Sequence, residues 1–348
     1  MPAATTNVPV SLGLMTWGRE GVEMARVHDL AGCEKMLDVF LAHGHNEVDS
    51  ALIYGEGSSE EYLGQIDWKG RGVVVDTKLA PGQYAGRDVK FTLDSMRKYI
   101  DVQLEAIKTD KFHLWYLHMP DASTSLEETL EAVNTLHKEG KFERFGVSNY
   151  SAAQVDDFCA IADKKGWIKP TAYQGIYNAL HRSVEKELFP VLRKHGISFY
   201  EFNPLGGGIF TGQLKRDNEV EKGSRFDPNT AQGKNYRQRY WRDEYFQALD
   251  LIEPVAKSNN LTLAEVRRRS LSLRAERVEQ APIALRWVSH HSLLSRDKGD
   301  NILIGASSVK HLESNLVDLE KGPLPQDVLD ALDKAWDLVK EVASPYHR

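Results

Sequence analysis

The feature that most constrains this chain is a regular alternation of two residue patterns along its length. Short runs rich in β-branched and aromatic residues alternate with segments in which apolar residues recur every three or four positions. The first pattern predicts strands and the second predicts helices, and strands that alternate with helices pair in parallel. Eight such units are typical of a closed (β/α)8 barrel. The sequence therefore predicts an α/β protein with the TIM barrel fold, with strands at residues 11–17, 46–50, 73–78, 112–118, 144–149, 171–176, 197–202 and 301–307.

An open, doubly wound sheet is the alternative architecture for such a pattern. When such a sheet binds a dinucleotide, it usually carries a Gly-x-Gly-x-x-Gly turn after its first strand. The nearest matches are GEGSSE at 55–60 and GGGIFTG at 206–212, and neither fits that turn. We therefore expect a single barrel domain over residues 1–348, with a long loop and a C-terminal tail over the barrel mouth.

Two segments interrupt the alternation. Residues 213–243 are polar and turn-rich, yet they carry four aromatic residues between Phe226 and Trp241. A loop of this length is usually functional or disordered, and the aromatic residues favour an ordered loop over the site. Residues 267–282 include five arginines and separate LTLAEV from IALRWV, two stretches that would join into one helix. This second segment is predicted to be an insertion, either a surface loop or retained non-coding sequence.

Composition excludes several classes of function. The chain has 44 Lys and Arg against 50 Asp and Glu, a net charge of −6, so bulk electrostatics does not favour nucleic-acid binding. It has no apolar stretch of the roughly 18 residues that a membrane span needs. Its two cysteines, Cys33 and Cys159, cannot form a disulfide framework, and the N-terminal residues do not resemble a signal peptide. We therefore expect a cytoplasmic protein with neither a membrane nor a nucleic-acid partner.

Polar side chains follow most of the predicted strands, where a barrel of this class places its site. Tyr54 lies five residues after one of them, Asp49, in a turn that contains glycine, so its side chain can point back over the barrel mouth. The polar residues at these strand ends are Asp49, Lys78, His118, Ser148, Asn149, Gln174 and Asn203.

Four of these residues suggest one proton-transfer unit. A buried Lys78 beside the Tyr54 hydroxyl would lower the pKa of that tyrosine, and Asp49 would keep the ammonium charged. Tyr54 would then serve as a general acid, while His118 would donate a hydrogen bond to a carbonyl oxygen. Taken singly, these residues more often form a structural ion pair, a packed ring or a strand cap. Their occurrence on successive strand ends favours a catalytic site.

The order of these motifs resembles the aldo-keto reductase superfamily over nearly the whole chain. The GSRF and NYRQRYW stretches and the terminal Arg are similar to the aflatoxin-aldehyde reductase branch of that superfamily. The matching stretches are VDSALIYGEGSSEEYLG (48–64), TK (77–78), LHMPD (117–121), GVSNY (146–150), YQGIYN (173–178), FNPLGGGIFTG (202–212) and GASSVKHLESNL (305–316).

The resemblance implies NADPH-dependent reduction of aldehydes or dicarbonyls, with Tyr54 as proton donor, Lys78 and Asp49 tuning it, and His118 positioning the carbonyl. It also implies a cofactor laid across the barrel mouth in an extended form. The residues it assigns to the cofactor are Ser148, Asn149 and Gln174 at the nicotinamide, Phe202 stacked on that ring, Asn203, Leu205, Gly206 and Gly207 at the pyrophosphate, Arg225 folded over it, and Ser307, Ser308, Lys310, His311 and Asn315 at the adenosine end.

Two departures from the family pattern bear on the cofactor and the substrate. Gly305 and His311 stand where many members hold the 2′-phosphate with Lys and Arg, so NADP is favoured but NAD stays open. Tyr236 and Arg239 are three residues apart and share a face if the segment is helical. With Arg348 they suggest a substrate that carries a carboxylate, because Arg pairs with that group bidentately. Otherwise Arg239 is a solvated loop charge and Arg348 a frayed tail.

Other functions stay open on sequence alone. A regulatory barrel that senses its cofactor, like the β subunits of potassium channels, would share the fold and bind NADPH with little turnover. A lyase or isomerase that uses Lys78 as a Schiff base would leave Tyr54 unexplained. The histidine pairs at 43/45 and 290/291 lack the acidic or cysteine spacing of a metal site, so no metal is expected. The expected partner is a small carbonyl compound, and a homodimer is possible.

Overall fold

The computed structural model describes residues 4–211, 214, 216, 220, 222–261 and 283–348. The predicted insertion at 267–282 lies outside the described residues, as do parts of the predicted loop at 213–243. The described part of that loop includes a helix, α7 (Ala231–Tyr240), which begins at the capping side chain of Thr230.

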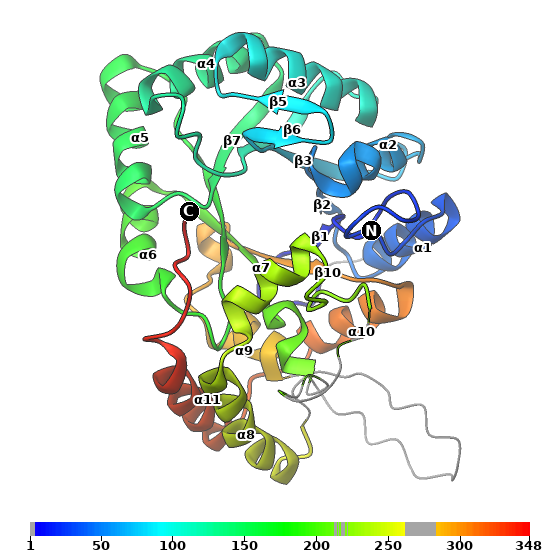
Figure 1. Cartoon of the computed structure of the whole chain (residues 1–348), viewed down its shortest axis with the longest axis vertical. Helices are drawn as coiled ribbons and strands as arrows, with labels where there is room; N and C mark the ends of the chain where they lie inside the picture. Colours follow the sequence, from blue (N-terminus) through cyan, green and yellow to red (C-terminus); the bar gives the residue numbers. More distant parts are fainter. Residues whose placement is uncertain (1–3, 212–213, 215, 217–219, 221, 262–282) are drawn as a thin grey trace.

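Eight parallel strands close into a barrel in the order β1-β10-β9-β8-β7-β6-β3-β2, which confirms the predicted TIM barrel (Figure 1). Each strand pairs in parallel with both neighbours, and helices pack around the outside. The barrel strands are β1 (Val10–Gly13), β2 (Glu47–Asp49), β3 (Val74–Leu79), β6 (Phe112–Leu117), β7 (Phe142–Ser148), β8 (Ala172–Ile176), β9 (Ser198–Phe202) and β10 (Asn301–Gly305).

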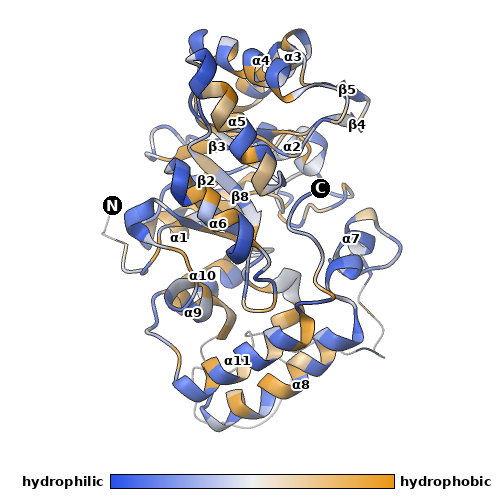
Figure 2. Cartoon of the chain, turned by 90° about the vertical axis from the view of Figure 1, so that its left-hand side faces the viewer, coloured by the Kyte–Doolittle hydropathy of each residue, from blue (hydrophilic) through white to orange (hydrophobic). Residues whose placement is uncertain are grey.

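The helices form where the sequence combines an apolar stripe with a capping residue. In α1, Cys33, Met36, Leu37 and Phe40 are buried on one face, and Asp29 accepts a hydrogen bond from the first turn. Figures 1 and 2 place α8 and α11 side by side below the barrel. Besides α7, the helices are α1 (Leu30–Ala42), α2 (Ser58–Gly64), α3 (Leu93–Ile107), α4 (Leu126–Lys138), α5 (Ala152–Lys165), α6 (Val184–His195), α8 (Asp243–Ser258), α9 (Ile283–His290), α10 (Val309–Leu319) and α11 (Gln326–Val339).

Two boundaries differ from the sequence prediction. The apolar spacing predicts a helix from Asp88 to about Lys108, but a short antiparallel hairpin, β4 (Gly82–Tyr84) and β5 (Arg87–Val89), follows β3, so α3 begins only at Leu93. Ala85 and Gly86 both have positive φ, which makes the tight turn of this hairpin. The first strand ends at Gly13 instead of residue 17, so the residues that follow it lie in a loop at the barrel mouth.

Toward the amino ends of the strands, the barrel interior holds charged groups instead of a purely apolar core. Nδ1 of His113 lies 2.9 Å from the buried Oδ1 of Asp76, and Glu47 lies next to both. Burial raises the pKa of Asp76 to about 7 and, together with the charge of Asp76, raises the pKa of Glu47. Arg144 contributes the compensating positive charge and donates to the Tyr200 hydroxyl at 3.3 Å. We therefore interpret this group as structural.

The raised pKa of Asp76 predicts a pH-dependent stability. Between about pH 4 and pH 7 the folded protein retains a proton that the unfolded chain has lost, so the free energy of unfolding falls as pH rises. Asp76→Asn removes this titration. From pH 5 to pH 8 the wild type should lose about 2–3 kcal/mol relative to this variant, measured by urea unfolding. Asp94→Asn, at a fully exposed side chain, is the control, and a pH-independent difference for Asp76→Asn would contradict the assignment.

Candidate active site

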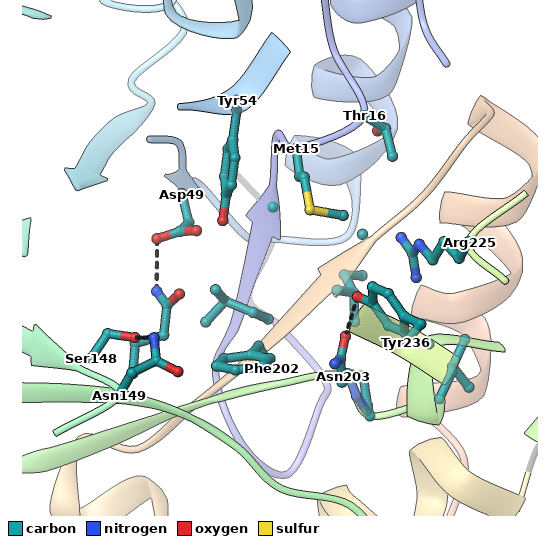
Figure 3. Close-up of a pocket in the computed structure, with 18 of the residues that line it drawn as sticks. Met15, Thr16, Asp49, Tyr54, Ser148, Asn149, Phe202, Asn203, Arg225 and Tyr236 are labelled. Atoms are coloured by element: carbon teal, nitrogen blue, oxygen red, sulfur yellow. Dashed lines mark hydrogen bonds between the residues drawn. The ribbon is translucent and has the colours of Figure 1, made fainter. Parts of the chain in front are cut away.

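A pocket opens at the carboxyl ends of the strands, as expected for a barrel of this class (Figure 3). Lys78 lies beneath its floor, and Gly206, Ser307, Ser308, Lys310 and His311 do not line it. The predicted site residues that do line it are Asp49, Tyr54, His118, Ser148, Asn149, Gln174, Phe202, Asn203, Leu205, Gly207, Arg225, Tyr236, Arg239, Asn315 and Arg348.

Beneath the pocket floor, Lys78 forms a buried ion pair with Asp49. Its Nζ lies 2.5 Å from Asp49 Oδ2 and 2.7 Å from the carbonyl oxygen of Ser50. The other carboxylate oxygen of Asp49 accepts a hydrogen bond of 2.8 Å from Nε2 of Gln174. Burial lowers the pKa of Lys78, while the charge of Asp49 opposes that shift. The ion pair therefore keeps an ammonium group charged in a region without solvent.

Tyr54 starts a 3-10 turn, η1 (Tyr54–Gly57), that directs its ring toward this ion pair. Gly55 has a φ of 54°, and a Cβ there would lie 2.6 Å from Ser58 Oγ, so the turn requires glycine. The ring centroid of Tyr54 lies 5.0 Å from Lys78 Nζ and 6.0 Å from the ring of His118. The structure thus brings together the four residues predicted for proton transfer.

The electrostatics of Tyr54 differ from the sequence prediction. Burial, followed by the negative charge of Asp49, raises the pKa of Tyr54 well above its usual value, whereas Lys78 was expected to lower it. That expectation is wrong for the structure described here, because Lys78 contacts the ring face and its charge is directed to Asp49. Tyr54 therefore keeps its proton throughout the physiological pH range.

His118 is neutral in this site. Burial lowers the pKa of its imidazole well below the usual value, and the positive charges of Lys78 and Arg348 add to that shift. Its Nδ1 atom is buried, and no described residue forms a hydrogen bond with it. Its carbonyl oxygen accepts a 2.8 Å hydrogen bond from Asn149 Nδ2, which fixes the backbone at the end of β6. A neutral imidazole carries one N–H, and so it can donate one hydrogen bond to a substrate oxygen.

Beside these residues lies a group of amide and hydroxyl side chains. Asn149 Nδ2 lies 3.0 Å from Ser148 Oγ, and Asn149 has a φ of 63°, a conformation that asparagine tolerates. Gln174 is oriented by its hydrogen bond to Asp49. These groups offer donors and acceptors on one wall of the pocket, where a flat polar amide such as a carboxamide fits.

The pocket continues past Phe202 toward α7. The Tyr236 hydroxyl donates to Asn203 Oδ1 at 3.1 Å (Figure 3), while Asn203 Nδ2 is buried and has no partner in the part of the chain that the structure describes. A Cβ at Gly207 would lie 2.2 Å from Cε1 of Tyr236, so only glycine permits this approach. Arg225 lies over the Tyr236 ring, with its guanidinium carbon 5.9 Å from the ring centroid. The amide of Asn203, the glycine turn at Gly207 and the guanidinium of Arg225 thus line one stretch of the pocket. Together they fit the phosphates of an extended dinucleotide.

At the far end, the residues predicted for the adenosine part divide into two groups. Asn315 lines the pocket, as does Gly305. Ser307 Oγ lies 3.0 Å from Nδ1 of His311, and Ser308 caps α10 by accepting from the His311 N–H at 3.2 Å. These two serines are therefore engaged within the protein.

The C-terminal tail is anchored over the barrel mouth, which contradicts the frayed-tail alternative. Ser344 Oγ lies 3.3 Å from His181 Nε2, and the Tyr346 hydroxyl accepts from the N–H of Ala152 at 3.1 Å. The N–H of Arg348 donates to the carbonyl oxygen of Asn149 at 3.0 Å. This anchoring places Arg348 in the pocket, where burial and the charge of Arg239 lower the pKa of its guanidinium.

Sequence reasoning assigned no site role to seven residues that line the pocket: Gly13, Met15, Thr16, Met119, Pro204, Leu303 and Ile304. Met119 directly follows His118, and Met15 and Thr16 follow the first strand. If that strand had been predicted to end at Gly13, Thr16 would have counted as a polar residue after a strand end, as Asp49 did. Because the predicted strand extended to residue 17, Thr16 was assigned to the strand itself.

Comparisons with known proteins agree with this geometry. The family model described as the aldo/keto reductase family matches residues 9–337. An aldo-keto reductase of Pseudocercospora fijiensis is 45% identical over 312 residues, which cover 89% of this chain and 99% of that protein. Human aldo-keto reductase family 7 member A3 is 40% identical over 333 residues, 94% of this chain and 95% of its own. Aflatoxin B1 aldehyde reductase member 2 of Mus musculus is 39% identical over 334 residues, 94% of this chain and 86% of its own.

The chain therefore belongs to the aldo/keto reductase family, whose members are oxidoreductases that act on carbonyl groups and generally use nicotinamide cofactors. The structure of a glycerol dehydrogenase from Gluconobacter oxydans matches the fold with a TM-score of 0.70 at 23% identity, over 97% of this chain and 93% of that one. Among the described residues, no helix is both long and apolar enough to span a membrane.

The ion pair predicts a specific pattern of stability changes. Lys78→Met should lower the free energy of unfolding by about 3–5 kcal/mol, because it leaves the buried carboxylate of Asp49 without its counter-ion. Adding Asp49→Asn removes that uncompensated charge, so the double variant should be more stable than Lys78→Met alone. Urea unfolding of each variant measures this.

Lys165→Met provides the surface control, since Lys165 pairs with Glu127 at 2.5 Å on an exposed part of the molecule. It should cost less than about 1 kcal/mol. If Lys78→Met unfolds at the same urea concentration as this control, the ion pair does not stabilise the fold.

Proposed function

We propose that the protein catalyses the NADPH-dependent reduction of aldehydes or dicarbonyls to alcohols, with Tyr54 as proton donor. The observation that carries the proposal is the convergence of Tyr54, His118 and the Lys78–Asp49 ion pair on one pocket. The family membership and the aldehyde reductases among the relatives support it. A cytoplasmic location and a homodimer stay predictions from the sequence.

Residues along the pocket would hold the cofactor in an extended form. Ser148, Asn149 and Gln174 would bind the carboxamide, and Phe202 would stack on the nicotinamide ring. Asn203, Gly207 and Arg225 would meet the phosphates, and Asn315 would meet the adenosine end. Bound NADPH supplies the hydride that the protein itself lacks. Lys310 and His311 do not line the pocket, so the preference for NADP over NAD rests on the family resemblance.

The protein's own part in the reaction is to orient the carbonyl and to deliver a proton. Neutral His118 donates a hydrogen bond to the carbonyl oxygen, which orients the substrate and stabilises negative charge there. Tyr54 then gives its hydroxyl proton to that oxygen. An alkoxide is far more basic than a tyrosinate, so Tyr54 remains an adequate acid despite its raised pKa. The ammonium of Lys78 lies against the face of the Tyr54 ring, 5.0 Å from its centroid, and holds that ring in place.

Lys78 is poorly suited to Schiff-base chemistry in this structure. Its side chain is fully buried, and its Nζ already donates to Asp49 and to the Ser50 carbonyl. A nucleophilic lysine must instead present an uncharged, accessible amine to the substrate.

The direct test of the proposal is NADPH oxidation by the purified protein with short aldehydes, diketones and carboxylated aldehydes, and with NADH in parallel. Steady oxidation that depends on the carbonyl compound supports the reductase. Tight NADPH binding without turnover on any of these compounds would instead favour the cofactor-sensing alternative.

Tyr54→Phe removes only the hydroxyl and should reduce turnover by about 10²–10⁴-fold, the usual contribution of general acid catalysis. The ring and its contact with Lys78 remain, so NADPH affinity, measured by fluorescence quenching, should stay unchanged. Tyr62→Phe, at a surface hydroxyl that donates to the His28 carbonyl, is the matched control. Full turnover by Tyr54→Phe would exclude Tyr54 as the donor.

The two guanidinium groups at the mouth predict a preference for a substrate that carries a carboxylate. Arg239 and Arg348 both line the pocket, and no acidic side chain other than Asp49 lines it among the described residues. Succinic semialdehyde should therefore be reduced with a lower KM than butyraldehyde. In Arg239→Ala and in Arg348→Ala this preference should fall at least about tenfold, mainly through KM. If both variants keep the wild-type preference, or if the wild type has none, the pocket does not recognise carboxylates.

A further inference from the structure

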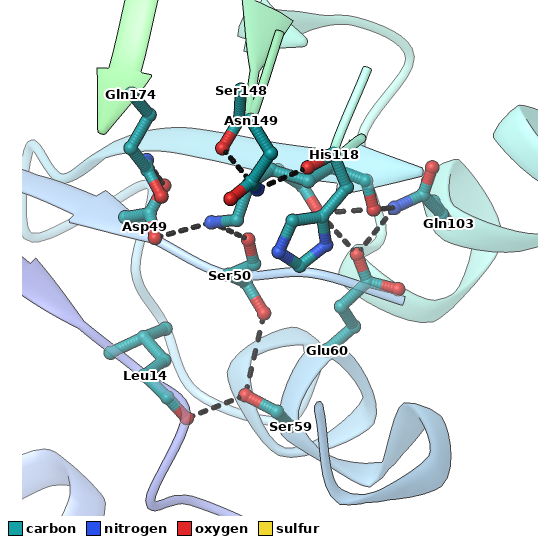
Figure 4. Close-up of polar contacts among 12 residues, drawn as sticks. Leu14, Asp49, Ser50, Ser59, Glu60, Gln103, His118, Ser148, Asn149 and Gln174 are labelled. Carbon is teal, nitrogen blue, oxygen red and sulfur yellow. Dashed lines mark hydrogen bonds and ion pairs between the residues drawn. The ribbon is translucent and has the colours of Figure 1, made fainter. Parts of the chain in front are cut away.

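A buried carboxyl group lies behind the active site on α2, the helix that directly follows the turn of Tyr54. Glu60 is fully buried. Its Oε1 atom accepts hydrogen bonds from Thr77 Oγ1 at 2.5 Å and from Gln103 Nε2 at 2.8 Å (Figure 4). Its Oε2 atom has no hydrogen-bond partner among the described residues. Burying a carboxyl group is costly, so a role in the active site would explain its retention at this position.

The partners of Glu60 lie on β3 and on α3, and both are linked to strands that deliver other active-site residues. Thr77 directly precedes Lys78 on β3, and Gln103 Nε2 lies 3.1 Å from the carbonyl oxygen of Lys78. Gln103 Oε1 accepts a 3.0 Å hydrogen bond from Nε1 of Trp115 on β6. His118 follows the end of β6. One network of buried hydrogen bonds therefore joins α2 to the strands that carry Lys78 and His118.

The position of α2 depends on these contacts, because a helix of seven residues is not stable alone. Ser59 Oγ donates to the carbonyl oxygen of Leu14 at 2.9 Å and lies 3.3 Å from Ser50 Oγ. Against α3 the fit is close, since a Cβ on Gly64 would lie 1.9 Å from the carbonyl oxygen of Ala106. Ser59 thus bonds α2 to the ends of β1 and β2, while Glu60 bonds it to β3 and α3.

The charge of Glu60 is linked to that of Lys78. Burial raises the pKa of Glu60 to about 7, while the hydrogen bonds from Thr77 and Gln103 and the charges of Lys78 and Arg87 oppose the shift. Among the described residues, the charge of Glu60 also acts on Tyr84, whose pKa is raised by burial and by this charge. The ionised carboxyl favours the ammonium form of Lys78 and accepts stronger hydrogen bonds than the neutral form.

We propose that Glu60 is a positioning residue for carbonyl reduction, whose buried carboxyl holds α2, and with it Tyr54, in register with Lys78 and His118. The inference rests on the proposed reductase function. Because the ionised group accepts the stronger hydrogen bonds, the chemical step should become faster as pH rises through about 7.

The test compares Glu60→Gln with Glu61→Gln. Glu61 is the next residue on the same helix, but its side chain is 45% exposed and pairs with Arg19 at the surface. The readouts are the single-turnover rate of NADPH oxidation from pH 5.5 to pH 9, KM for the aldehyde and Kd for NADPH. Glu60→Gln should slow the single-turnover rate at least about tenfold and remove its rise near pH 7. Glu61→Gln should match the wild type in rate, pH profile, KM and Kd.

Thr77→Val provides a second variant that keeps the charge and shape of the site while deleting one donor to Glu60. Thr77→Val should slow the single-turnover rate less than Glu60→Gln does, and both variants should leave KM for the aldehyde and Kd for NADPH unchanged. If Glu60→Gln does not fold, Thr77→Val serves as the test. If a folded Glu60→Gln turns over with the rate and pH profile of Glu61→Gln, Glu60 does not position the active site. If Glu60→Gln does not fold and Thr77→Val has the single-turnover rate of the wild type, Glu60 is likewise excluded from this role. A wild type that reduces no carbonyl compound overturns the proposed function, and this inference with it.

Discussion

The ion pair between Lys78 and Asp49 is the interaction on which the rest of the site depends. An ammonium group in the barrel interior is tolerated only with a counter-charge and further acceptors, and Asp49 with the Ser50 carbonyl supplies both. Once paired, Asp49 orients Gln174 through its second oxygen. Lys78 presents its charge to the face of the Tyr54 ring. Two charged residues thereby determine the positions of an amide and a phenol that come from distant parts of the chain.

The barrel makes this arrangement possible because it brings eight strand ends to one mouth. Parallel pairing determines which residues are neighbours in the interior: Asp49 pairs with Asp76 on β3, and Lys78 pairs with Tyr116 on β6. The Asp76 group, which Arg144 balances, lies toward the amino ends of the strands. The ion pair of Lys78 and Asp49 lies nearer the mouth, below the pocket, and its charges also act on Asp76. The same fold therefore connects a structural charge cluster to the charges of the proposed active site.

The barrel mouth combines two uncharged hydrogen-bond donors with two guanidinium groups, and both kinds of group suit the proposed carbonyl reduction. Tyr54 is protonated and His118 is neutral at physiological pH, so both can donate to a substrate oxygen. Arg239 and Arg348 reach the same pocket from α7 and from the anchored tail. The chain covers nearly the full length of its relatives, and the barrel and the four central residues lie within the matched region. In the proposed reaction, substrate choice would depend on the segments that close the mouth, since these contribute Arg239 and Arg348 to the pocket.

The sequence by itself determined the barrel, because the two periodicities and the strand-end polar residues are local features that short stretches reveal. It also determined most of the residues that gather at the mouth, since parallel strands bring their carboxyl ends together. Only the tertiary structure decided the hairpin after β3, the raised pKa of Tyr54, the anchoring of the tail and the network around Glu60. Most of these depend on burial and on partners far apart in the chain: Ala152 and Tyr346 bond across 194 positions, and Glu60 and Gln103 across 43. Solvent exclusion and long-range contacts arise only when the barrel closes, and no local pattern encodes them.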